Sequence, residues 1–442
     1  MSSGVISLIG VIIGLFFFGF LAYKGWHLIP TAAFCGIIVA LFSRMNVYEA
    51  LTTLFMPAYA NFFKSYFLLF MASSCFAKLM QDCGAIGVVA HALSKLCYKF
   101  KSRQAQRIAA ILTIPLINTV IVYGGVNVFA AVFIVVHIGK ELFEEFDIPW
   151  HYYGVGTLGT AVLSQFIPGT PELVNLVPNE FFGTDAMAGP VLGIIGTILF
   201  VIGGILYVKV CLENSDKHAE GFLPTGQRII DEAPVAPEVA NIPVIVAVIP
   251  LISVWVLLNL VKLPAVLSLF FSAILASVLF FKRLRGKFRN CLAEGSVRAV
   301  STLALLCATV AFGGVVSASE GYTWVCDLIK GSGPAGAFQI AIFVNLLAGL
   351  TASASGSIKI VLNTFADAYL ASGIAPGALH RLVICSSLGL NTLPHAAGVA
   401  SIAATCKLEL KDFYKHVFWM SVFLPTVISL ILALLITLGL QC

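Results

Sequence analysis

Long apolar runs follow one another along most of this 442-residue sequence. A helix needs about 20 apolar residues to cross a bilayer, and runs close to that length cover residues 6–22, 28–42, 62–80, 243–260, 265–281 and 300–316. These runs are continuous, whereas strands of a membrane β-barrel alternate apolar and polar residues over about ten positions. The sequence therefore predicts an all-α integral membrane protein.

Composition excludes a soluble protein. The chain is 59% hydrophobic and 11% charged, against roughly 45–50% and about 25% in soluble domains. Its main partner is expected to be the lipid bilayer, and nothing points to nucleic acid. The 11 cysteines stand singly without a C-x-x-C pair, so neither a metal site nor a disulfide framework is expected, and no cofactor is predicted.

One polar segment divides the chain. Residues 213–241 contain charged residues such as Asp216, Lys217, Glu220, Arg228, Asp231 and Glu232 together with Pro224, Pro234 and Pro237, and such a segment cannot bury an apolar face. We interpret it as a linker between a first half, residues 1–212, and a second half, residues 242–442. The apolar run near the N-terminus has neither a basic region before it nor a small-residue cleavage site after it, and is interpreted as a retained span.

The two halves have similar patterns. Each contains three apolar runs and a short interfacial segment, followed by a predicted re-entrant hairpin (about 104–146 and 335–372) and a predicted broken span (about 152–182 and 376–406). Pro149 and Pro168 are 19 residues apart, Pro376 and Pro394 are 18 apart, and the offsets between halves are 227 and 226. Matching interruptions in the same order indicate an internal repeat.

A final span in each half brings the predicted total to about ten transmembrane helices. Five crossings per half make the two repeats inverted. Basic clusters at residues 95–107, 282–289 and 407–415 then fall on one side, which the positive-inside rule assigns to the cytoplasm. We therefore expect a multi-pass protein of the cell (inner) membrane, with the N-terminus outside and the 213–241 linker cytoplasmic.

The interruptions in apolar segments predict a cavity. Unpaired backbone groups cost several kcal/mol in hydrocarbon, so non-helical chain at membrane depth persists only against protein or water. Half-helix N-termini offer N–H donors and positive dipole ends there, which suits an anion. The candidate substrate-binding residues are those of the hairpin tips and breaks: Gly124, Gly125, Asn127, Thr170, Ser353, Ser355, Gly356, Ser357, Lys359, Asn391 and Thr392.

Three titratable residues in these segments are candidates for proton coupling: His395, Glu172 and Asp367. An ionisable residue inside a span is costly and is a functional candidate by default. Glu172 is equally suited to a structural ion pair with Lys359.

Two further pairs of polar residues have less direct interpretations. Asn118 and Thr119 offer oxygen ligands for sodium as a rival coupling ion. His380 and Arg381 are expected to cap a helix or face headgroups rather than the cavity.

Two segments resemble the gluconate permease (GntP) family of the ion transporter superfamily. Residues 352–412 carry a serine/glycine tip, an LHR triplet at 379–381 and a G-L-N-T-L-P-H turn at 389–395, and residues 164–190 resemble the proline-rich turn of the first half. Many relatives have LPHNGA, whereas this chain has LPHAAG. The resemblance implies uptake of an organic anion coupled to protons by an elevator-type movement.

The sequence thus predicts a secondary active transporter, with proton-coupled symport of a small organic monocarboxylate such as a gluconate-like sugar acid or hydroxy acid. The alternative is a sodium-coupled carboxylate symporter or a cation/proton antiporter on the same fold. A channel would show rings of like charge, and an intramembrane enzyme would show motifs such as G-x-S-x-G or H-E-x-x-H. Neither is evident, so no enzyme is expected. A homo-oligomer such as a dimer is left open.

Overall fold

The computed structural model describes residues 3–24, 26–126, 128–232, 240–331, 336–351, 353–394 and 396–441. These residues form helices and connecting turns and contain no β-strand, which confirms the predicted all-α class. Asn127 and His395, two of the predicted site residues, lie outside the described residues.

Ten apolar helices are candidates for membrane crossing among the described residues. Six are long and apolar enough to span a bilayer: Ser3–Leu21, Val47–Asp82, Arg103–Tyr123, Pro190–Lys217, Phe288–Ser317 and Leu410–Thr437. Four are shorter: Leu28–Phe42, Val244–Leu260, Ala265–Leu279 and Ala337–Gly349. Large apolar side chains such as Ile194, Ile198 and Ile202 are exposed along one helix, as expected where a helix faces lipid. The protein is a multi-pass helical membrane protein.

The described residues of the first half form eleven α-helices and three short helices of other types. In chain order these are α1 (Ser3–Tyr23), α2 (Leu28–Phe42), α3 (Val47–Glu49), the π-helix η1 (Ala50–Phe55), α4 (Met56–Asp82), α5 (Ala85–Ser94), η2 (Lys95–Lys99), α6 (Arg103–Tyr123), α7 (Val128–Glu145), η3 (Trp150–Tyr152), α8 (Tyr153–Phe166), α9 (Leu173–Leu176), α10 (Asn179–Phe182) and α11 (Pro190–Lys217). A short helix, α12 (Gln227–Glu232), lies in the polar linker.

The described part of the second half contains eleven α-helices after the linker and three short helices of other types, while the internal repeat stays a prediction. It comprises α13 (Val244–Trp255), the π-helix η4 (Val256–Leu260), α14 (Ala265–Leu279), α15 (Phe281–Leu284), α16 (Phe288–Ser317), α17 (Glu320–Gly331), α18 (Ala337–Thr351), α19 (Ala354–Leu370), α20 (Pro376–Ser387), η5 (Leu390–Thr392), α21 (Ala397–Thr405), α22 (Leu410–Val417), the π-helix η6 (Phe418–Phe423) and α23 (Leu424–Thr437).

Two helices are longer than the apolar runs that predicted them. The run at 62–80 belongs to a helical segment that begins at Val47, where the Asn46 side chain accepts hydrogen bonds from the backbone of Tyr48 and Glu49. The run at 300–316 belongs to α16, which begins at Phe288. Hydropathy marks only the part of a helix that needs an apolar solvent, whereas backbone hydrogen bonds continue the helix into water.

The helices form two groups. In the first, which we call the panel, α4 packs along α16, and α1, α2 and α14 pack around this pair. In the second, the hairpin group, α6, α7 and α8 pack together, α18, α19, α20 and α23 pack together, and contacts of α8 with α20 and of α11 with α23 join the two sets. The groups meet where α19 packs on α16 and α7 on α4.

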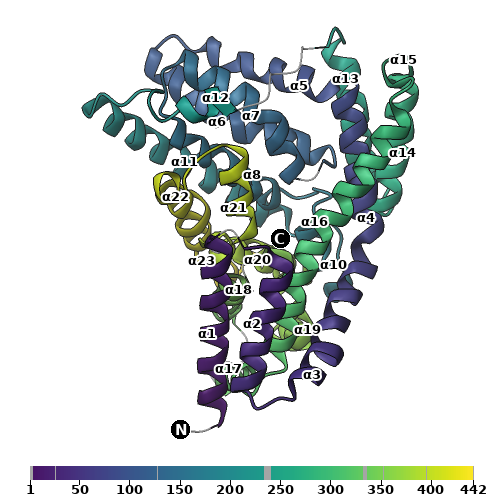
Figure 1. Cartoon of the computed structure of the whole chain (residues 1–442), viewed down its shortest axis with the longest axis vertical. Helices are drawn as coiled ribbons and strands as arrows, with labels where there is room; N and C mark the ends of the chain where they lie inside the picture. Colours follow the sequence, from purple (N-terminus) through teal and green to yellow (C-terminus); the bar gives the residue numbers. More distant parts are fainter. Residues whose placement is uncertain are drawn as a thin grey trace.

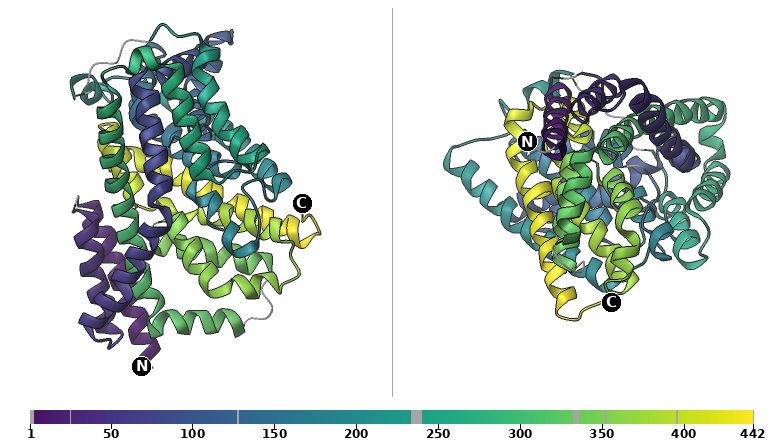
Figure 2. Two further views of the ribbon diagram at one scale, coloured as in Figure 1. Left: turned by 90° about the vertical axis from the view of Figure 1, so that its right-hand side faces the viewer. Right: turned by 90° about the horizontal axis from the view of Figure 1, so that it is seen from below.

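The two hairpins lie toward opposite ends of the molecule. Figure 1 shows α6 and α7 in the upper part and α18 and α19 in the lower part, and the side view in Figure 2 agrees. In each half, a helix–break–helix element follows the hairpin: α8 to α10 in the first and α20 to α21 in the second. Two inverted halves would place their hairpins in this way, and the inversion of the halves stays a prediction.

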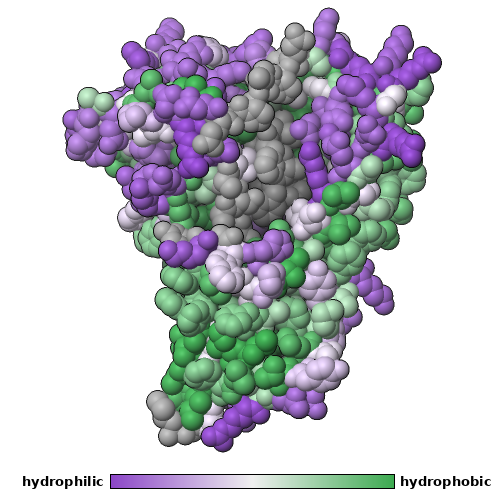
Figure 3. All heavy atoms as spheres, in the orientation of Figure 1, coloured by the Kyte–Doolittle hydropathy of each residue, from purple (hydrophilic) through white to green (hydrophobic). Residues whose placement is uncertain are grey.

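Polar surface is concentrated at one end. In Figure 3 the surface over α5, α12 and α15 is hydrophilic, and a broad hydrophobic surface covers the lower half near α1 and α2. α15 carries Lys282 and Arg283, and η2 begins and ends with lysine. The linker helix and two of the basic clusters thus share an end, opposite the N-terminus, and assignment of this end to the cytoplasm stays a prediction.

Candidate functional site

The first broken helix is held open by hydrogen bonds from other elements. α8 ends at Phe166, and Gly169 then adopts a φ of +90°, a conformation that favours glycine. The Gly169 N–H donates to the Ala186 carbonyl at 2.8 Å, and the Asn259 amide of η4 donates to the Gly169 carbonyl at 2.9 Å. The Tyr123 hydroxyl at the end of α6 donates to the Pro168 carbonyl. This break is therefore a structured element with partners in both halves.

Arg381 of α20 supplies most of the remaining donors. Its side chain is fully buried, and its guanidinium donates to the carbonyls of Gln165, Ala186 and Ala188 and to Asn175 Oδ1, at 2.7–3.4 Å. Arg381 thus caps the C-terminal end of α8 through the Gln165 carbonyl, whereas the alternative that it faces headgroups is wrong, because its side chain is buried. Carbonyls freed by a broken helix need donors at membrane depth, and this arginine provides them from the opposite half.

The segment after the first break lies directly against α20. The φ of Gly189 is +58°, and a Cβ there would lie 2.5 Å from the Gly377 carbonyl oxygen and 2.7 Å from the Arg381 Cβ. His380, fully buried, places its Nδ1 2.7 Å from the Thr184 hydroxyl. The expectation that His380 faces headgroups is therefore also wrong, because both residues of this pair join the two broken helices.

The second break is held by the last span. The Thr392 hydroxyl donates to the Ser421 carbonyl of η6 at 2.8 Å, and the Tyr414 hydroxyl donates to the Thr392 carbonyl at 3.3 Å. A π-helix leaves backbone carbonyls out of the regular ladder, which allows such contacts. The half-buried Asn391 has no hydrogen-bond partner for Oδ1 among the described residues. Of the predicted binding residues Asn391 and Thr392, Thr392 thus already uses its hydroxyl in a hydrogen bond to a backbone carbonyl.

The tip of the first hairpin packs tightly against the panel and the second half. A Cβ on Gly124 would clash with Leu251 of α13, and one on Gly125, whose φ is +86°, would clash with Leu269 of α14. The carbonyl of Gly125 accepts a hydrogen bond from Ser73 of α4 at 2.6 Å. Both glycines are required for this close approach.

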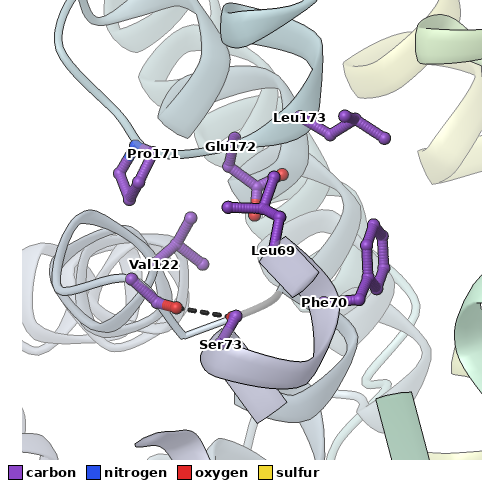
Figure 4. Close-up of a pocket in the computed structure, with 8 residues that line it drawn as sticks. Leu69, Phe70, Ser73, Val122, Pro171, Glu172 and Leu173 are labelled. Carbon is purple, nitrogen blue, oxygen red and sulfur yellow. Dashed lines mark hydrogen bonds between the residues drawn. The ribbon is translucent and has the colours of Figure 1, made fainter. Parts of the chain in front are cut away.

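A small cavity joins this tip to the first break. Figure 4 shows Glu172 projecting from the chain after Pro171 toward Leu69 of α4, with Ser73 and its hydrogen bond alongside. We call this the tip cavity, and it is lined by Leu69, Phe70, Ser73, Val122, Gly125, Pro171, Glu172 and Leu173. Its volume is about 40 Å³, enough for a few water molecules or an ion and far below that of an organic ligand site.

Polar groups near the tip cavity extend this environment. The Gln165 side-chain amide lies 3.4 Å from Glu172 Oε2. Thr170 is fully buried, and its hydroxyl has no hydrogen-bond partner in the part of the chain that the structure describes. Its carbonyl accepts from Asn175 at 2.9 Å. Glu172 thus lines the tip cavity, whereas Thr170, two residues earlier in the chain, is buried beside it.

Serines at the tip of the second hairpin begin helix α19. The Ser353 hydroxyl accepts from the Gly356 N–H at 3.2 Å, which is an N-cap interaction. Ser357 donates to the Ala354 carbonyl at 2.8 Å. Ser355 and Gly356 are buried in the first turn of the helix. Two of the predicted binding hydroxyls therefore already have partners within their own helix.

Lys359 forms an ion pair that differs from the one considered in the sequence. Its Nζ lies 2.7 Å from Glu180 Oε2 and 4.9 Å from the Phe181 ring centre. A structural pair between Lys359 and Glu172 was the alternative, and this alternative is wrong. α10 packs against α19 and brings Glu180 to the lysine instead. Asp367 is exposed two turns further along α19 and lines neither cavity.

A second, larger cavity contains Lys359. We call it the lysine cavity; it has a volume of about 250 Å³ and lies between α4, α16 and α19. It is lined by Ala58, Asn61, Phe62, Ser65, Tyr66, Val310, Gly314, Ser317, Lys359, Ile360, Asn363 and Thr364. This volume approaches the lower limit of typical small-molecule sites, and the cavity carries a positive charge on one wall.

Asn118 and Thr119 of α6 are buried with unsatisfied polar atoms. Both side-chain polar atoms of Asn118 and the hydroxyl of Thr119 have no hydrogen-bond partner among the described residues. Buried polar groups are nearly always paired, so these atoms are available to an ion or to water. No group of three or more His, Cys, Asp or Glu residues in the described ranges is arranged to hold a metal ion.

A charged pair outside the spans joins the loop after the first broken helix to the loop before α14. Lys262, between η4 and α14, places Nζ 2.5 Å from Asp185 Oδ2. The hydrogen bond from Lys262 holds the pKa of the Asp185 carboxyl below its usual value. Both side chains are about half exposed.

The sequence interpretation missed four residues that line these cavities, Asn61, Ser65, Tyr66 and Ser73, and Glu180, which pairs with Lys359. All but Glu180 lie on α4. The available signal is the presence of polar residues on one helix, but Asn61 lies just outside the apolar run at 62–80, and a serine within an apolar run is not by itself a signal of a site. Glu180 follows the first break and joins the site only through packing of α10 on α19.

Comparison with known proteins gives a general assignment. No family model matches the chain, and the resemblance to gluconate permeases stays a prediction. The chain is 27% identical over 461 aligned positions, covering 93% of it, to an uncharacterised transporter, YxjC, of Bacillus subtilis (strain 168), of which 95% is covered. A crystal structure of the YdaH transporter of Alcanivorax borkumensis matches with a TM-score of 0.44 and 13% identity, over 87% of this chain and 88% of that one. The chain is thus a multi-pass helical membrane protein that is similar over nearly its whole length to a bacterial transporter.

Proposed function

We propose that the protein is a secondary active transporter that moves a small organic monocarboxylate inward together with protons. The observation that carries the proposal is the tip cavity, where Glu172 faces a water-sized space between the first hairpin tip, the first break and α4. A carboxylate beside so small a space at membrane depth suits the binding of a proton. Similarity to a transporter over 93% of the chain supports the general class.

Protonation provides the physical reason for coupling. A charged carboxylate is costly to move through a low-dielectric region, and protonation removes that charge. A substrate anion brings a charge of its own, which Lys359 compensates. In the proposed cycle, Glu172 carries the proton and the substrate binds elsewhere in the same group of helices.

The division into two helix groups supports an elevator-type movement. Hydrogen bonds of Arg381 and Tyr123 connect the broken helices and the first hairpin within the hairpin group. The panel contacts that group through helix packing and through the hydrogen bond between Ser73 and Gly125. A rigid hairpin group that slides along the panel would carry the site from one side to the other.

Uptake into proteoliposomes tests the proposal. Labelled gluconate, 3-hydroxybutyrate and lactate are the probes, with an acidic exterior as the driving force. We expect the pH gradient to accelerate uptake and a protonophore to abolish the acceleration. Glu172→Gln should lose the response to pH. Glu144→Gln, an exposed carboxylate at the end of α7, is the control and should respond as the wild type does. Uptake that is indifferent to the pH gradient contradicts the proposal.

Sodium coupling is the second candidate, because Asn118 and Thr119 hold buried oxygen atoms without partners in the described residues. Hard cations such as sodium prefer oxygen ligands, so these atoms suit that ion. Replacing sodium by choline at fixed pH separates the two candidates. Uptake that depends on sodium, is lost in Asn118→Leu and persists in Glu172→Gln favours sodium as the coupling ion.

A further inference from the structure

The lysine cavity combines one cation with several hydrogen-bonding side chains. Asn61 and Ser65 of α4 and Asn363 and Thr364 of α19 line it together with Lys359. Apolar residues of α4 and α16 complete its walls. A positive charge flanked by amides and hydroxyls on one side, and apolar surface on the other, suits a short carboxylate that carries hydroxyl groups.

Tyr66 adds an unsatisfied polar group to this cavity. Its side chain is 6% exposed, and its hydroxyl has no hydrogen-bond partner among the described residues. An unpaired buried hydroxyl is unfavourable, so a ligand that pairs with it binds more tightly. Tyr66 lines the same cavity as Lys359.

The two side chains of the Lys359–Glu180 ion pair differ in their exposure to solvent. The Lys359 side chain is 23% exposed, whereas the Glu180 side chain is 57% exposed. Ion pairs with a solvent-exposed member contribute little to stability, so Glu180 can leave the lysine at little cost. Glu180 also belongs to the short helix α10, while Lys359 lies on the long helix α19. The carboxylate of Glu180 is therefore the exchangeable member of the pair.

We propose that the lysine cavity binds the carboxylate group of a small hydroxy acid, and that Glu180 occupies Lys359 until the ligand displaces it. The ligand carboxylate then pairs with Lys359 and accepts a hydrogen bond from Tyr66, while Asn61 and Asn363 bind its hydroxyl groups. Glu180 returns to solvent when the ligand binds. This inference deepens the proposed function and rests on it only for the direction of transport, because binding itself needs no gradient.

The lysine cavity lies between the two helix groups, so displacement of Glu180 by a ligand also affects how these groups contact each other. Of the helices that line the cavity, α4 and α16 belong to the panel and α19 belongs to the hairpin group. Glu180 lies in the segment between the first break and α11, and Arg381 is hydrogen-bonded to the same segment at the Ala188 carbonyl. A ligand that replaces Glu180 thus changes the contact between the first-half segment and the second hairpin. Substrate binding and movement of the hairpin group are coupled at this point.

Binding to the purified full-length protein in detergent tests the inference. The probes are the sodium salts of lactate, 3-hydroxybutyrate and gluconate, with sodium chloride at equal ionic strength as the blank. Thermal shift and titration calorimetry give the dissociation constants. We expect Glu180→Gln to bind at least one probe roughly two- to fivefold more tightly than the wild type does, because the internal competitor is removed.

Two variants probe the groups that would hold the ligand. Lys359→Met should weaken binding more than about tenfold, because a hydrogen bond to a charged group is lost. Tyr66→Phe should weaken it about two- to tenfold while it leaves the fold intact, since only a hydroxyl without a described partner is removed. Asp185→Asn, which breaks an ion pair outside both cavities, is the matched control and should leave the affinity unchanged.

The outcomes separate this inference from the proposed function. Weaker or unchanged binding in Glu180→Gln overturns displacement, and unchanged binding in Lys359→Met overturns the site. Absence of binding by every probe to both wild type and Glu180→Gln also overturns it. If Glu180→Gln tightens binding but uptake ignores the pH gradient, the cavity is a carboxylate site and proton coupling is wrong. If uptake follows the gradient and these variants bind like the wild type, coupling stands and the inference fails.

Discussion

Arg381 Nη2, in the second broken helix, lies 2.7 Å from the carbonyl oxygen of Ala188, in the loop after the first broken helix. The same guanidinium also reaches the Gln165 carbonyl at the end of α8 and the Asn175 side chain. One residue from the second half thus completes the hydrogen bonding of the first. The two broken helices therefore form a single unit, which is the property that rigid movement of a transport site requires.

Arg381→Lys is expected to destabilise the protein. Lysine has three donors on one nitrogen and cannot match the planar set that reaches four different acceptors, so buried carbonyls are left unpaired. Hydrogen bonds to charged groups contribute about 1.5–3 kcal/mol each, and a loss on the order of 3 kcal/mol is expected. Thermal unfolding of the detergent-solubilised protein, followed by tryptophan fluorescence, measures this as a lower Tm.

Arg298→Lys is the control for that substitution. Arg298 lies on the exposed side of α16 and contacts the Gln81 side chain at 3.3 Å, so its replacement should leave the Tm nearly unchanged. Equal unfolding temperatures for Arg381→Lys and the wild type would show that the buried hydrogen bonds do not hold the broken helices together.

Gly389→Ala should disrupt the second break. An added Cβ would clash with Asn345 of α18 and Thr426 of α23, and inserting a methyl group into a packed interior costs about 1–3 kcal/mol. Both the Tm and carboxylate uptake should fall. Gly87→Ala in α5, where a Cβ meets no atom within 4 Å, is the matched control and should be neutral or slightly stabilising. A Gly389→Ala protein with the wild-type Tm would contradict the close approach.

Sequence alone predicted the all-α membrane class because hydropathy reports directly on the solvent that a helix needs. It also marked the positions of helix breaks, since Pro and Gly disrupt helices by local sterics. It did not predict where α4 and α16 begin, because polar turns such as those before Met56 continue a helix without any hydropathy signal. Orientation in the membrane stays a prediction.

The site was harder to predict than the fold, and Arg381 shows why. A lone arginine beside a histidine at the start of a span resembles a headgroup contact, and only the tertiary fold shows that five acceptor contacts from the other half surround it. Glu180 presents the same difficulty, because its pairing with Lys359 spans 179 positions. Glu172 is different: its place after the first break and beside the hairpin tip follows from repeat order, and the structure puts it in a cavity with Gly125.

Thr392→Val should separate structural from binding roles at the second break. The Thr392 hydroxyl donates to the Ser421 carbonyl, so its loss leaves a buried carbonyl in η6 short of a donor. A destabilisation of about 1 kcal/mol is expected, with unchanged affinity for the carboxylate probes. Thr392→Ser retains the hydroxyl and should recover most of the Tm. A Thr392→Val protein with normal Tm and weakened binding would instead make the hydroxyl a ligand contact.

The ion pair between Asp185 and Lys262 should make a small contribution to stability that depends on pH. Lys262 lowers the folded-state pKa of Asp185 below its ordinary value of 3.8. A carboxyl with a lowered folded-state pKa stabilises the fold fully above its unfolded pKa, and this contribution is lost as the pH falls through the folded-state value. At neutral pH, Asp185→Asn should therefore lower stability, by less than about 1 kcal/mol because both side chains are half exposed. The difference in Tm between wild type and variant should shrink as the pH is lowered below about 4 and vanish when wild-type Asp185 is protonated. If the Tm difference between wild type and Asp185→Asn is the same at neutral and acidic pH, the charge of Asp185 does not stabilise the contact with Lys262 in the loop before α14.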